Sequence, residues 1–209
     1  MASEITEIVD KIGATDVIIN GDLKSGTDRI LRSEWENVPK FLSILSGKCH
    51  VSLVPGNHDG GLAHLVSGNV ELVDASGLYV CGNLIIHGHT RPLAKYADCT
   101  RIIMGHVHPI FQRKGSPLSG QPLWILARVP RKAIFRDSFL DSNASDLVEV
   151  IVMPSFNKEL STTGYSSEIT REERKVSPLV RDVKDASDAI VSTLNGEIIG
   201  DAEMLRAIL

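Results

Sequence analysis

Residues 16–22 read Asp-Val-Ile-Ile-Asn-Gly-Asp (DVIINGD), a short apolar run that ends in a glycine and a carboxylate. Continuous apolar runs of this length are typical of strands buried in a parallel sheet. Apolar residues recur at helical spacing before it, at 5–12, and after it, at 35–45, and a glycine closes each segment. A second apolar run follows at 51–54. The order helix, strand, helix, strand predicts an α/β fold.

The rest of the chain predicts hairpins, further strands and a final helix. Asn195-Gly196, between apolar stretches at 190–194 and 197–199, is the strongest short hairpin signal. The final helix is expected from Asp201 to Leu209, with Asp201 as its N-cap. Other strands are expected at 78–80 and 84–86, joined by a short Cys-Gly-Asn turn, at 101–104, and, in a second sheet, at 123–126 and 148–153.

The expected organisation is one domain with an internal connection. Residues 1–157 form its core, and residues 158–175 are a polar stretch without elements of its own. Residues 176–209 then complete the same domain with a hairpin and a helix. The composition agrees with such a domain, because 43% of the residues are hydrophobic and 23% are charged, enough apolar material for a core.

Charge and cysteine content limit the classes of function and location. A net charge of −4 argues against a basic nucleic-acid groove across the whole surface, although bound cations could still attract a phosphate. The three cysteines stand at no metal or redox spacing, which favours a reducing, cytoplasmic interior with the thiols as small apolar fillers. No signal peptide and no run of about 18 apolar residues is present, so no membrane span is expected.

The histidines are not scattered. Five of the seven lie in three short motifs that contain glycine: GNHD at 56–59, HGH at 87–89 and GHVH at 105–108. Each motif follows an expected strand, and so does Gly21-Asp22. All four clusters therefore lie at the carboxyl ends of strands, where open α/β sheets bind their ligands.

These clusters offer one carboxylate, one amide oxygen and several imidazoles. Mixed oxygen and nitrogen donors suit Mn²⁺, Fe or Zn²⁺. If residues 105–108 are extended, His106 and His108 project to one side and could serve two ions about 4 Å apart. Any one motif could be an ordinary turn, and Asn-Gly-Asp at 20–22 is a common one. Their joint order favours metal binding, and the expected ligands are Asp22, Asn57, His87, His106 and His108.

Over residues 15–112 the chain resembles the calcineurin-like metallophosphoesterase superfamily. The pattern of that superfamily runs DxH, GD, GNH[DE], a His before Gly, and GHxH, and this chain matches it from Gly21-Asp22 onward. In finer detail it is similar to the archaeal SbcD-related and the bacterial ligase-associated phosphoesterases. The features in common are Gly21-Asp22-Leu23-Lys24, Ile103 to His106 with Pro109, and Pro154 to Asn157.

The resemblance implies a fold, a reaction and residue roles. The fold is a metallophosphoesterase-type two-sheet sandwich flanked by helices (αββα). A hydroxide activated by two divalent ions, Mn²⁺ first among the candidates, attacks a phosphodiester, with DNA or a nucleotide as substrate. Asp22 bridges both ions, Asn57, His87 and His106 complete the second, and His108 goes to the first. His58 does not bind metal and acts as the general acid or as a transition-state stabiliser, oriented by Asp59.

One part of the family pattern is missing. No DxH occurs, and no histidine precedes His50, so the first strand and two ligands of the first metal are absent from this sequence. A truncated or misassigned start and a degenerate protein both explain this. We expect the 209-residue chain to be weakly active or inactive. An exposed sheet edge would favour a homodimer.

Several alternatives stay open at this point. Besides a phosphodiesterase, the chain could be a non-catalytic metal- or nucleotide-binding remnant, or a phosphomonoesterase or nucleotide hydrolase on the same scaffold. His89 could touch substrate or be a loop residue, and Lys24 is more simply a solvated lysine. A basic stretch could contact a nucleic-acid backbone or only be solvated. Its cations are Arg128, Arg131, Lys132 and Arg136.

Overall fold

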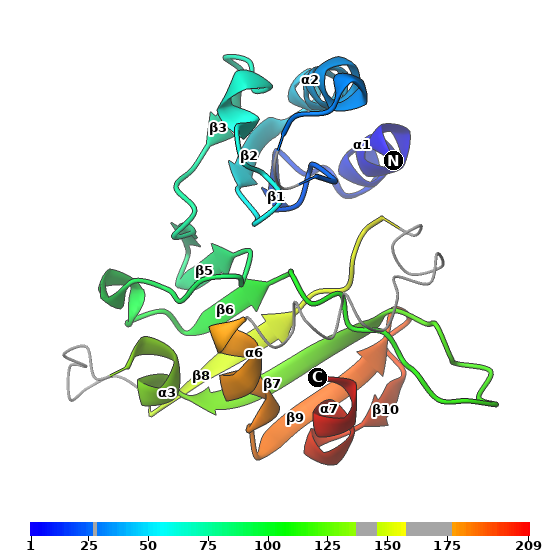
Figure 1. Ribbon diagram of the computed structural model, residues 1–209, viewed down its shortest axis with the longest axis vertical. Coiled ribbons are helices and arrows are strands. Elements are labelled where there is room, and N and C mark those ends of the chain that lie inside the picture. Colours follow the sequence, from blue (N-terminus) through cyan, green and yellow to red (C-terminus); the bar gives the residue numbers. More distant parts are fainter. Residues whose placement is uncertain (27–28, 137–145, 158–176) are drawn as a thin grey trace. The chain divides into compact units, whose positions relative to one another are not determined.

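A computed structural model describes residues 1–26, 29–136, 146–157 and 177–209 (Figure 1). The chain divides into two compact units, residues 1–78 and 79–209, and each is described by itself. The polar connection expected at 158–175 lies outside the described residues. The expected domain bounds stay a prediction.

The first unit is a three-stranded parallel sheet with two α-helices. The strand order is β1-β2-β3, and β1 pairs in register with β2 from Asp16 opposite His50 to Asn20 opposite Val54. The helices and strands predicted up to residue 54 are confirmed. The elements in chain order are α1 (Ala2–Ile12), β1 (Asp16–Asn20), α2 (Arg32–Ser46), β2 (His50–Val54), the 3-10 turn η1 (Leu62–His64) and β3 (Val70–Leu72).

Apolar spacing explains how this unit holds together. In α2, Leu42 and Leu45 are three residues apart, lie on one face and are fully buried. They belong to the same apolar cluster as Val51 and Leu53 of β2. Helix α1 ends at Gly13, whose φ of 64° places it in the left-handed region that glycine adopts without strain. The core thus fixes β1 and β2 side by side, with both carboxyl ends at one edge.

The second unit is a mixed seven-stranded sheet in the order β10-β9-β7-β8-β6-β5-β4. Strands β5, β6 and β8 run parallel, and β7 lies antiparallel to both β8 and β9. The strands are β4 (Leu78–Val80), β5 (Asn83–Ile86), β6 (Arg101–Met104), β7 (Leu123–Pro130), β8 (Leu147–Val152), β9 (Asp188–Thr193) and β10 (Ile198–Gly200). The helices are the 3-10 turn η2 (Ala94–Tyr96), α3 (Arg131–Phe135), α6 (Pro178–Lys184) and α7 (Ala202–Ile208).

The parallel part of this sheet positions two of the histidine motifs. Because β5 and β6 pair in parallel from Asn83 opposite Arg101 to Ile86 opposite Met104, the residues that follow them emerge at the same edge. Leu84, Ile102 and Met104 are buried in the core beneath this edge. The HGH and GHVH segments therefore begin next to each other, although they are far apart in the chain.

The α/β class is confirmed. The two sheets, of three and seven strands with helices against them, are consistent with the expected metallophosphoesterase-type αββα sandwich. Both expected hairpins are found as neighbouring strands, and Asp201 caps α7 by accepting from the Glu203 amide at 2.9 Å. Strands β7 and β8 lie in a second sheet, as expected, and this sheet also includes β4, β5 and β6.

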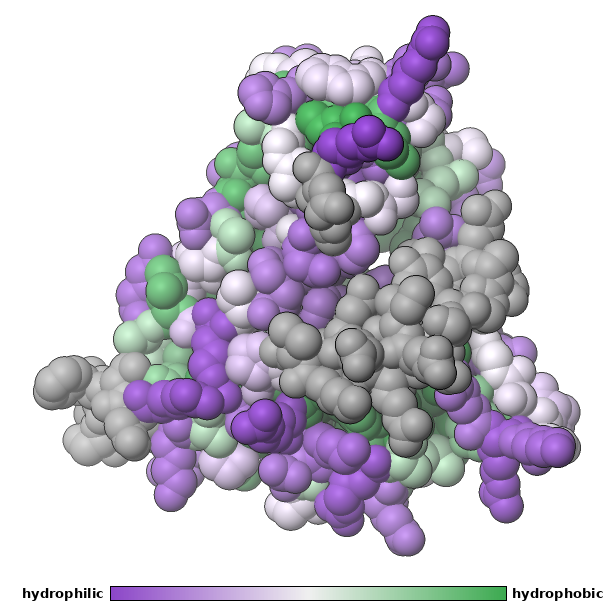
Figure 2. Space-filling view, viewed as in Figure 1, coloured by the Kyte–Doolittle hydropathy of each residue, from purple (hydrophilic) through white to green (hydrophobic). Residues whose placement is uncertain are grey.

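The surface and the helices add two facts. Among the residues that Figure 2 colours by hydropathy, hydrophilic side chains alternate with smaller apolar areas. Scattered exposed apolar side chains of this kind are ordinary for folded proteins. Among the described helices, none combines the length and the apolar character needed to span a membrane.

Candidate metal centre

Asp22 stands in a strained turn directly after β1. Gly21 and Asp22 both have positive φ, at 81° and 53°. The Asp22 carboxylate accepts the backbone N–H of His58 at 3.2 Å. A Cβ at Gly56 would overlap the Asp22 carboxylate and approach its backbone nitrogen to 2.5 Å, so only glycine fits there. The Gly21-Asp22 turn and the GNHD loop thus form one tightly packed pair.

Asp59 and Lys24 tie these two loops together. The buried Asp59 carboxylate accepts from the backbone N–H of Gly56 at 2.8 Å and of Lys24 at 3.0 Å. The Lys24 ammonium donates to the carbonyls of Gly60 at 2.6 Å and His58 at 3.2 Å. Lys24 is only 3% exposed, so the interpretation of it as a solvated lysine is wrong. Carbonyl acceptors make its burial tolerable.

His58 lies half-buried in the same loop, and its ring meets the neighbouring turn. Its Nδ1 is 3.0 Å from the carbonyl oxygen of Ser25. The contacts of Asp59 described above go to backbone amides, so its expected task of orienting the His58 ring stays a prediction. Asn57, also half-buried, directly precedes His58, and its role as a ligand stays a prediction as well.

In the second unit, three histidine rings gather at the ends of β5 and β6. His87 is 1% exposed and His106 is 7% exposed. Their ring centroids are 5.1 Å apart in an edge-on arrangement, and His89 lies 5.4 Å from His87 and 6.2 Å from His106. Ring nitrogens of His87 and His106 lie within 4.8 Å of each other. Two imidazole nitrogens bound to one divalent ion at about 2.1 Å each lie at most about 4.2 Å apart, so the rings are close to the spacing that a shared ion requires.

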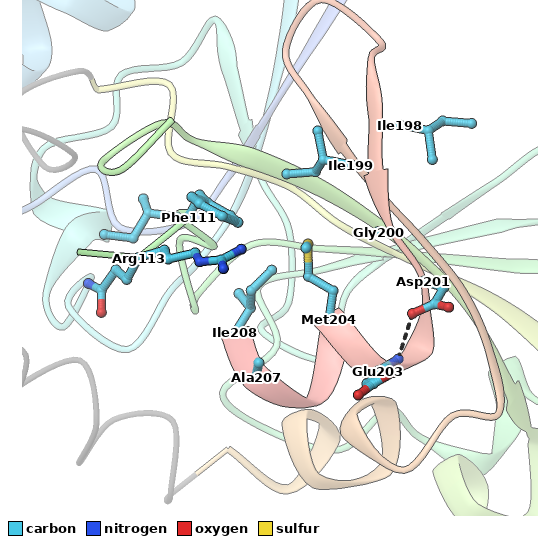
Figure 3. A pocket seen from close by; sticks show the side chains of 12 residues that line it. Phe111, Arg113, Ile198, Ile199, Gly200, Asp201, Glu203, Met204, Ala207 and Ile208 are labelled. Atoms are coloured by element: carbon cyan, nitrogen blue, oxygen red, sulfur yellow. Dashed lines mark hydrogen bonds between the residues drawn. The ribbon is translucent and has the colours of Figure 1, made fainter. Parts of the chain in front are cut away.

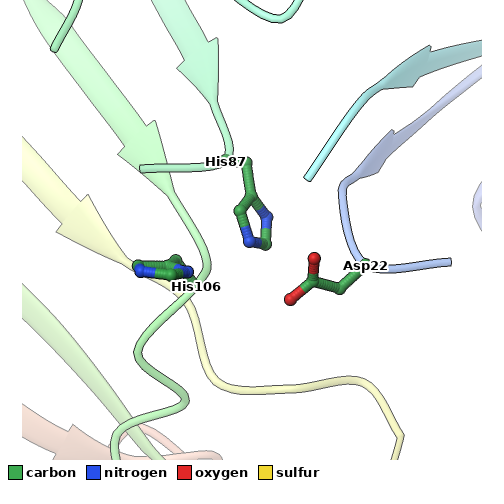
Figure 4. Close-up of side chains that lie close together, drawn as sticks. All are labelled: Asp22, His87 and His106. Carbon is green, nitrogen blue, oxygen red and sulfur yellow. The ribbon is translucent and has the colours of Figure 1, made fainter. Parts of the chain in front are cut away.

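Figure 4 shows how the strands present these residues. His87 follows β5, His106 follows β6, and Asp22 follows β1, each on the turn just beyond its strand. Each of the three residues therefore lies at the carboxyl end of a strand, as the sequence predicted. Burial of two imidazoles in a folded core is costly unless their ring nitrogens find partners, and a metal ion is one such partner.

The GHVH segment is a tight turn and not extended. The Val107 amide donates to the Gly105 carbonyl at 2.7 Å, and His106 and His108 both have positive φ, at 63° and 40°. The condition of an extended backbone at residues 105–108 is therefore not met, because the chain turns as soon as β6 ends. His106 is buried and His108 is half-buried. The period-two argument for their common direction does not apply here.

Ser177 and Met104 hold the HGH segment. The buried Ser177 hydroxyl donates to the Gly88 carbonyl at 2.8 Å and accepts from the Val180 amide at 3.4 Å, as the N-cap of α6. Gly88 has a φ of 111°, and a Cβ there would come within 2.7 Å of the Met104 side chain. The segment between His87 and His89 is thus fixed on both sides. Nothing in the sequence near residue 88 indicates the contact with Ser177.

Left-handed backbone concentrates at the expected ligands. Among the described residues other than glycine, five have positive φ, and three of the five are expected metal ligands. Such conformations cost of order 1–3 kcal/mol each and persist where the surroundings enforce them, often at functional sites. The three are Asp22, His106 and His108, and the other two are Cys81 and Arg136.

The basic stretch has mostly structural tasks. Arg131 is buried and donates to the carbonyls of Ala97 and Cys99 at 2.6 Å and of Leu147 at 3.1 Å. The expectation that Arg131 belongs to an exposed basic loop is therefore wrong. Arg128 lies on β7 and pairs with Asp188 at 3.2 Å in an exposed ion pair.

A pocket of about 750 Å³ opens elsewhere on the second unit (Figure 3). It lies between β10, α7 and the segment 110–113. Ile198, Ile199, Met204 and Ile208 supply apolar lining, and Arg113 lies on the opposite side. None of the expected site residues lines this pocket.

The chain was compared with known families, curated proteins and solved structures. No protein family model matches the chain, and no curated protein matches it. A solved structure, the nuclease MPE of Pseudomonas putida, is similar with 16% sequence identity and a TM-score of 0.46. The likeness covers 75% of this chain and 66% of that chain, which is just under two thirds of the nuclease. A likeness of this degree does not decide the function.

Proposed function

We propose that this chain is a metal-dependent phosphoesterase of the calcineurin-like metallophosphoesterase superfamily that acts on phosphodiesters, nucleic acid among them. The backbone strain at Asp22, His106 and His108 carries the proposal. Strain is retained where the surrounding structure enforces it for a purpose, and these are residues that motif order assigns to metals. Aspartate and histidine adopt left-handed backbone more often than most residues other than glycine, so the support comes from the coincidence of three such positions with the expected ligands.

The proposed metal position with the fuller ligand set takes one carboxylate, one amide and two imidazoles. Asp22, Asn57, His87 and His106 are its ligands, and His108 shares Asp22 with a second ion. The donor set fits Mn²⁺ first, with Fe and Zn²⁺ as the alternatives. The closeness of the buried His87 and His106 rings supports it. A bound divalent cation would offset phosphate charge and make a coordinated water more acidic.

The residues of the chain divide the remaining tasks. His58 donates a proton to the leaving oxygen from Nε2, because its Nδ1 faces the Ser25 carbonyl. Asp59 and Lys24 fix the loop that carries His58, through backbone groups on both sides of it. General acids of this kind contribute about 10²–10⁴-fold to the rate.

The test is hydrolysis of bis-p-nitrophenyl phosphate by the 209-residue chain with Mn²⁺. We expect weak, metal-dependent cleavage that His58→Ala abolishes, while His50→Ala, at an exposed histidine of β2, leaves it unchanged. Cleavage is expected to be weak because the first ion would have only two side-chain ligands in this sequence, Asp22 and His108. The other two ligands of the family pattern come from the DxH motif, which this sequence does not contain. Robust cleavage would contradict that incomplete site, and cleavage that survives His58→Ala would contradict the assigned acid.

A second candidate is binding without catalysis. A chain that binds metal and hydrolyses neither ester would be a non-catalytic metal- or nucleotide-binding remnant. Comparing the diester with p-nitrophenyl phosphate separates the diesterase from a phosphomonoesterase on the same scaffold. Cytoplasmic location and a homodimer stay predictions.

A further inference from the structure

Glu34 is a buried carboxylate with an unusual number of donors. It is 7% exposed and lies in the first turn of α2. Its Oε2 accepts the Leu31 amide at 2.8 Å, which caps the start of the helix. Its Oε1 accepts both the amide and the hydroxyl of Ser25, at 2.9 Å and 3.0 Å, and the Gly26 amide at 3.5 Å. One side chain therefore fastens the Asp22–Gly26 turn to α2.

The residue fastened in this way is the one that meets His58. Ser25 offers its amide and hydroxyl to Glu34, and its carbonyl oxygen lies 3.0 Å from His58 Nδ1. A carbonyl oxygen accepts and never donates, so this hydrogen bond requires the proton on Nδ1. The neutral ring then has Nε2 as its acceptor, and the charged ring has Nε2–H as the donor toward substrate.

We propose that Glu34 is a positioning residue for His58, which acts by holding the Ser25 peptide so that its carbonyl keeps the imidazole proton on Nδ1. The catalytic part of this proposal rests on the proposed function, in which His58 is the general acid. Glu34 does not touch substrate. It acts through Ser25, nine residues before it in the chain.

The ionised carboxylate suits this task better than an amide would. Oε1 meets three donors from Ser25 and Gly26, and Oε2 meets a fourth from Leu31. A glutamine would turn its NH₂ group toward one of these N–H donors, and the two donors would oppose each other. Burial raises the pKa of Glu34, but the hydrogen bonds from Leu31, Ser25 and Gly26 outweigh it and hold the pKa below the ordinary 4.5.

A purely structural helix cap is the competing explanation. Capping alone requires the Leu31 contact, and it predicts a loss of stability without any change at His58. If Glu34 is a positioning residue, its replacement also changes the tautomer of the His58 ring, which Glu34 does not contact. The two are separated by a measurement on the His58 ring itself.

The experiment records the ring ¹⁵N spectrum of the metal-free full chain in alkaline buffer, so that the tautomers of the neutral rings can be compared. We expect His58 as the Nδ1–H tautomer in the wild type and as a mixture with the Nε2–H tautomer in Glu34→Gln. Glu36→Gln is the matched control, because Glu36 is an exposed glutamate of the same helix. It should leave the His58 signals unchanged.

The wild type and two variants each test the proposal separately. A wild-type His58 in the Nε2–H tautomer would overturn it without any variant, even if Glu34→Gln fails to fold. Unchanged His58 signals in a folded Glu34→Gln protein would reduce Glu34 to a helix cap. Ser25→Ala keeps the carbonyl and should therefore keep the Nδ1–H tautomer of His58. If this variant loses that tautomer, the Ser25 hydroxyl and not the carbonyl held by Glu34 controls the ring, which would overturn the proposal.

This readout is independent of catalysis and of metal. If the chain hydrolyses no phosphoester, the tautomer result still stands or falls by itself. If the chain is active, Glu34→Gln should lower kcat and leave KM near its wild-type value, because the carboxylate orients the acid and binds no substrate.

Discussion

Lys24 illustrates how a charged side chain can serve as a cross-link. Its ammonium is buried and meets the carbonyls of His58 and Gly60, which lie 34 and 36 residues away in the chain. Sequence alone could not indicate this, because the acceptors are backbone groups brought close by folding. The motif residues around it were recognisable because GNHD is short, contains glycine and follows a strand.

Replacing Lys24 by methionine should destabilise the protein by about 1–3 kcal/mol, because the two carbonyls would lose a charged donor inside the fold. Urea denaturation measures this change. Lys48→Met is the control, since Lys48 pairs with Asp10 on the surface at 2.9 Å and such pairs contribute about 0–1 kcal/mol. Equal effects of the two substitutions would refute the assigned cross-link.

The three cysteines differ in exposure, so the interpretation of all of them as apolar fillers is wrong for one. Cys99 is buried, Cys49 is half-buried, and Cys81 is exposed on the turn between β4 and β5. Burial raises the pKa of the Cys99 thiol to about 11, although Arg131 opposes the shift.

Thiol-specific labelling of the native protein at pH 8 should therefore modify Cys81 first and leave Cys99 unmodified. Peptide mapping by mass spectrometry locates the label. Denatured protein, in which all three cysteines react, provides the control. Fast labelling of Cys99 in the native state would show that the packing around β6 and α3 is open.

At the scale of elements, apolar runs and periodicity predicted the strands and long helices because those elements bury one face or both. Strand β3, with three residues, is too short to show a pattern. Helices α3 and α6 were missed, although Ser177-Pro178 supplies an N-cap and a first-turn proline for α6. The left-handed turn of GHVH was missed because histidine adopts both extended and left-handed backbone, so the motif itself does not show where the chain turns.

Ser177 joins α6 to the HGH segment, so its loss should cost more than loss of a cap alone. Ser177→Ala removes the cap of α6 and the donor to Gly88, and we expect about 2 kcal/mol of destabilisation. Asp201→Ala removes only the exposed cap of α7 and should cost about 1 kcal/mol. Thermal unfolding compares them, and a smaller effect for Ser177→Ala would argue against the link.

Glu34 should also shape the acid stability of the protein. Because its folded pKa lies below 4.5, the unfolded chain binds the proton more readily, and the carboxylate stabilises the fold above pH 4.5. That contribution is lost as the pH falls from 4.5 through the lowered folded pKa. The free energy difference between wild type and Glu34→Gln should be constant near neutral pH and shrink in acid. A difference that grows in acid would contradict this sign.

For the molecule as a whole, the α/β class followed from apolar runs, and the order of glycine-containing motifs selected the candidate ligands. The sequence could not indicate the contacts that hold the neighbouring loops, which run from Ser25 to His58, from Lys24 to Gly60 and from Ser177 to Gly88. These depend on long-range packing of each unit. The ligand assignment itself, with Asp22 from the first unit and His87 and His106 from the second, stays a proposal.

The proposed metal site requires Asp22 and His106 to hold the same divalent ion. Isothermal titration calorimetry with Mn²⁺ tests it on the wild type, Asp22→Ala, His106→Ala and the double variant, with His50→Ala as control. We predict that each single variant weakens Mn²⁺ binding at least about tenfold, or ~1.4 kcal/mol. The double variant should lose much less than the sum, because both changes damage one site. Wild-type affinity in Asp22→Ala, or strictly additive losses, would contradict the account.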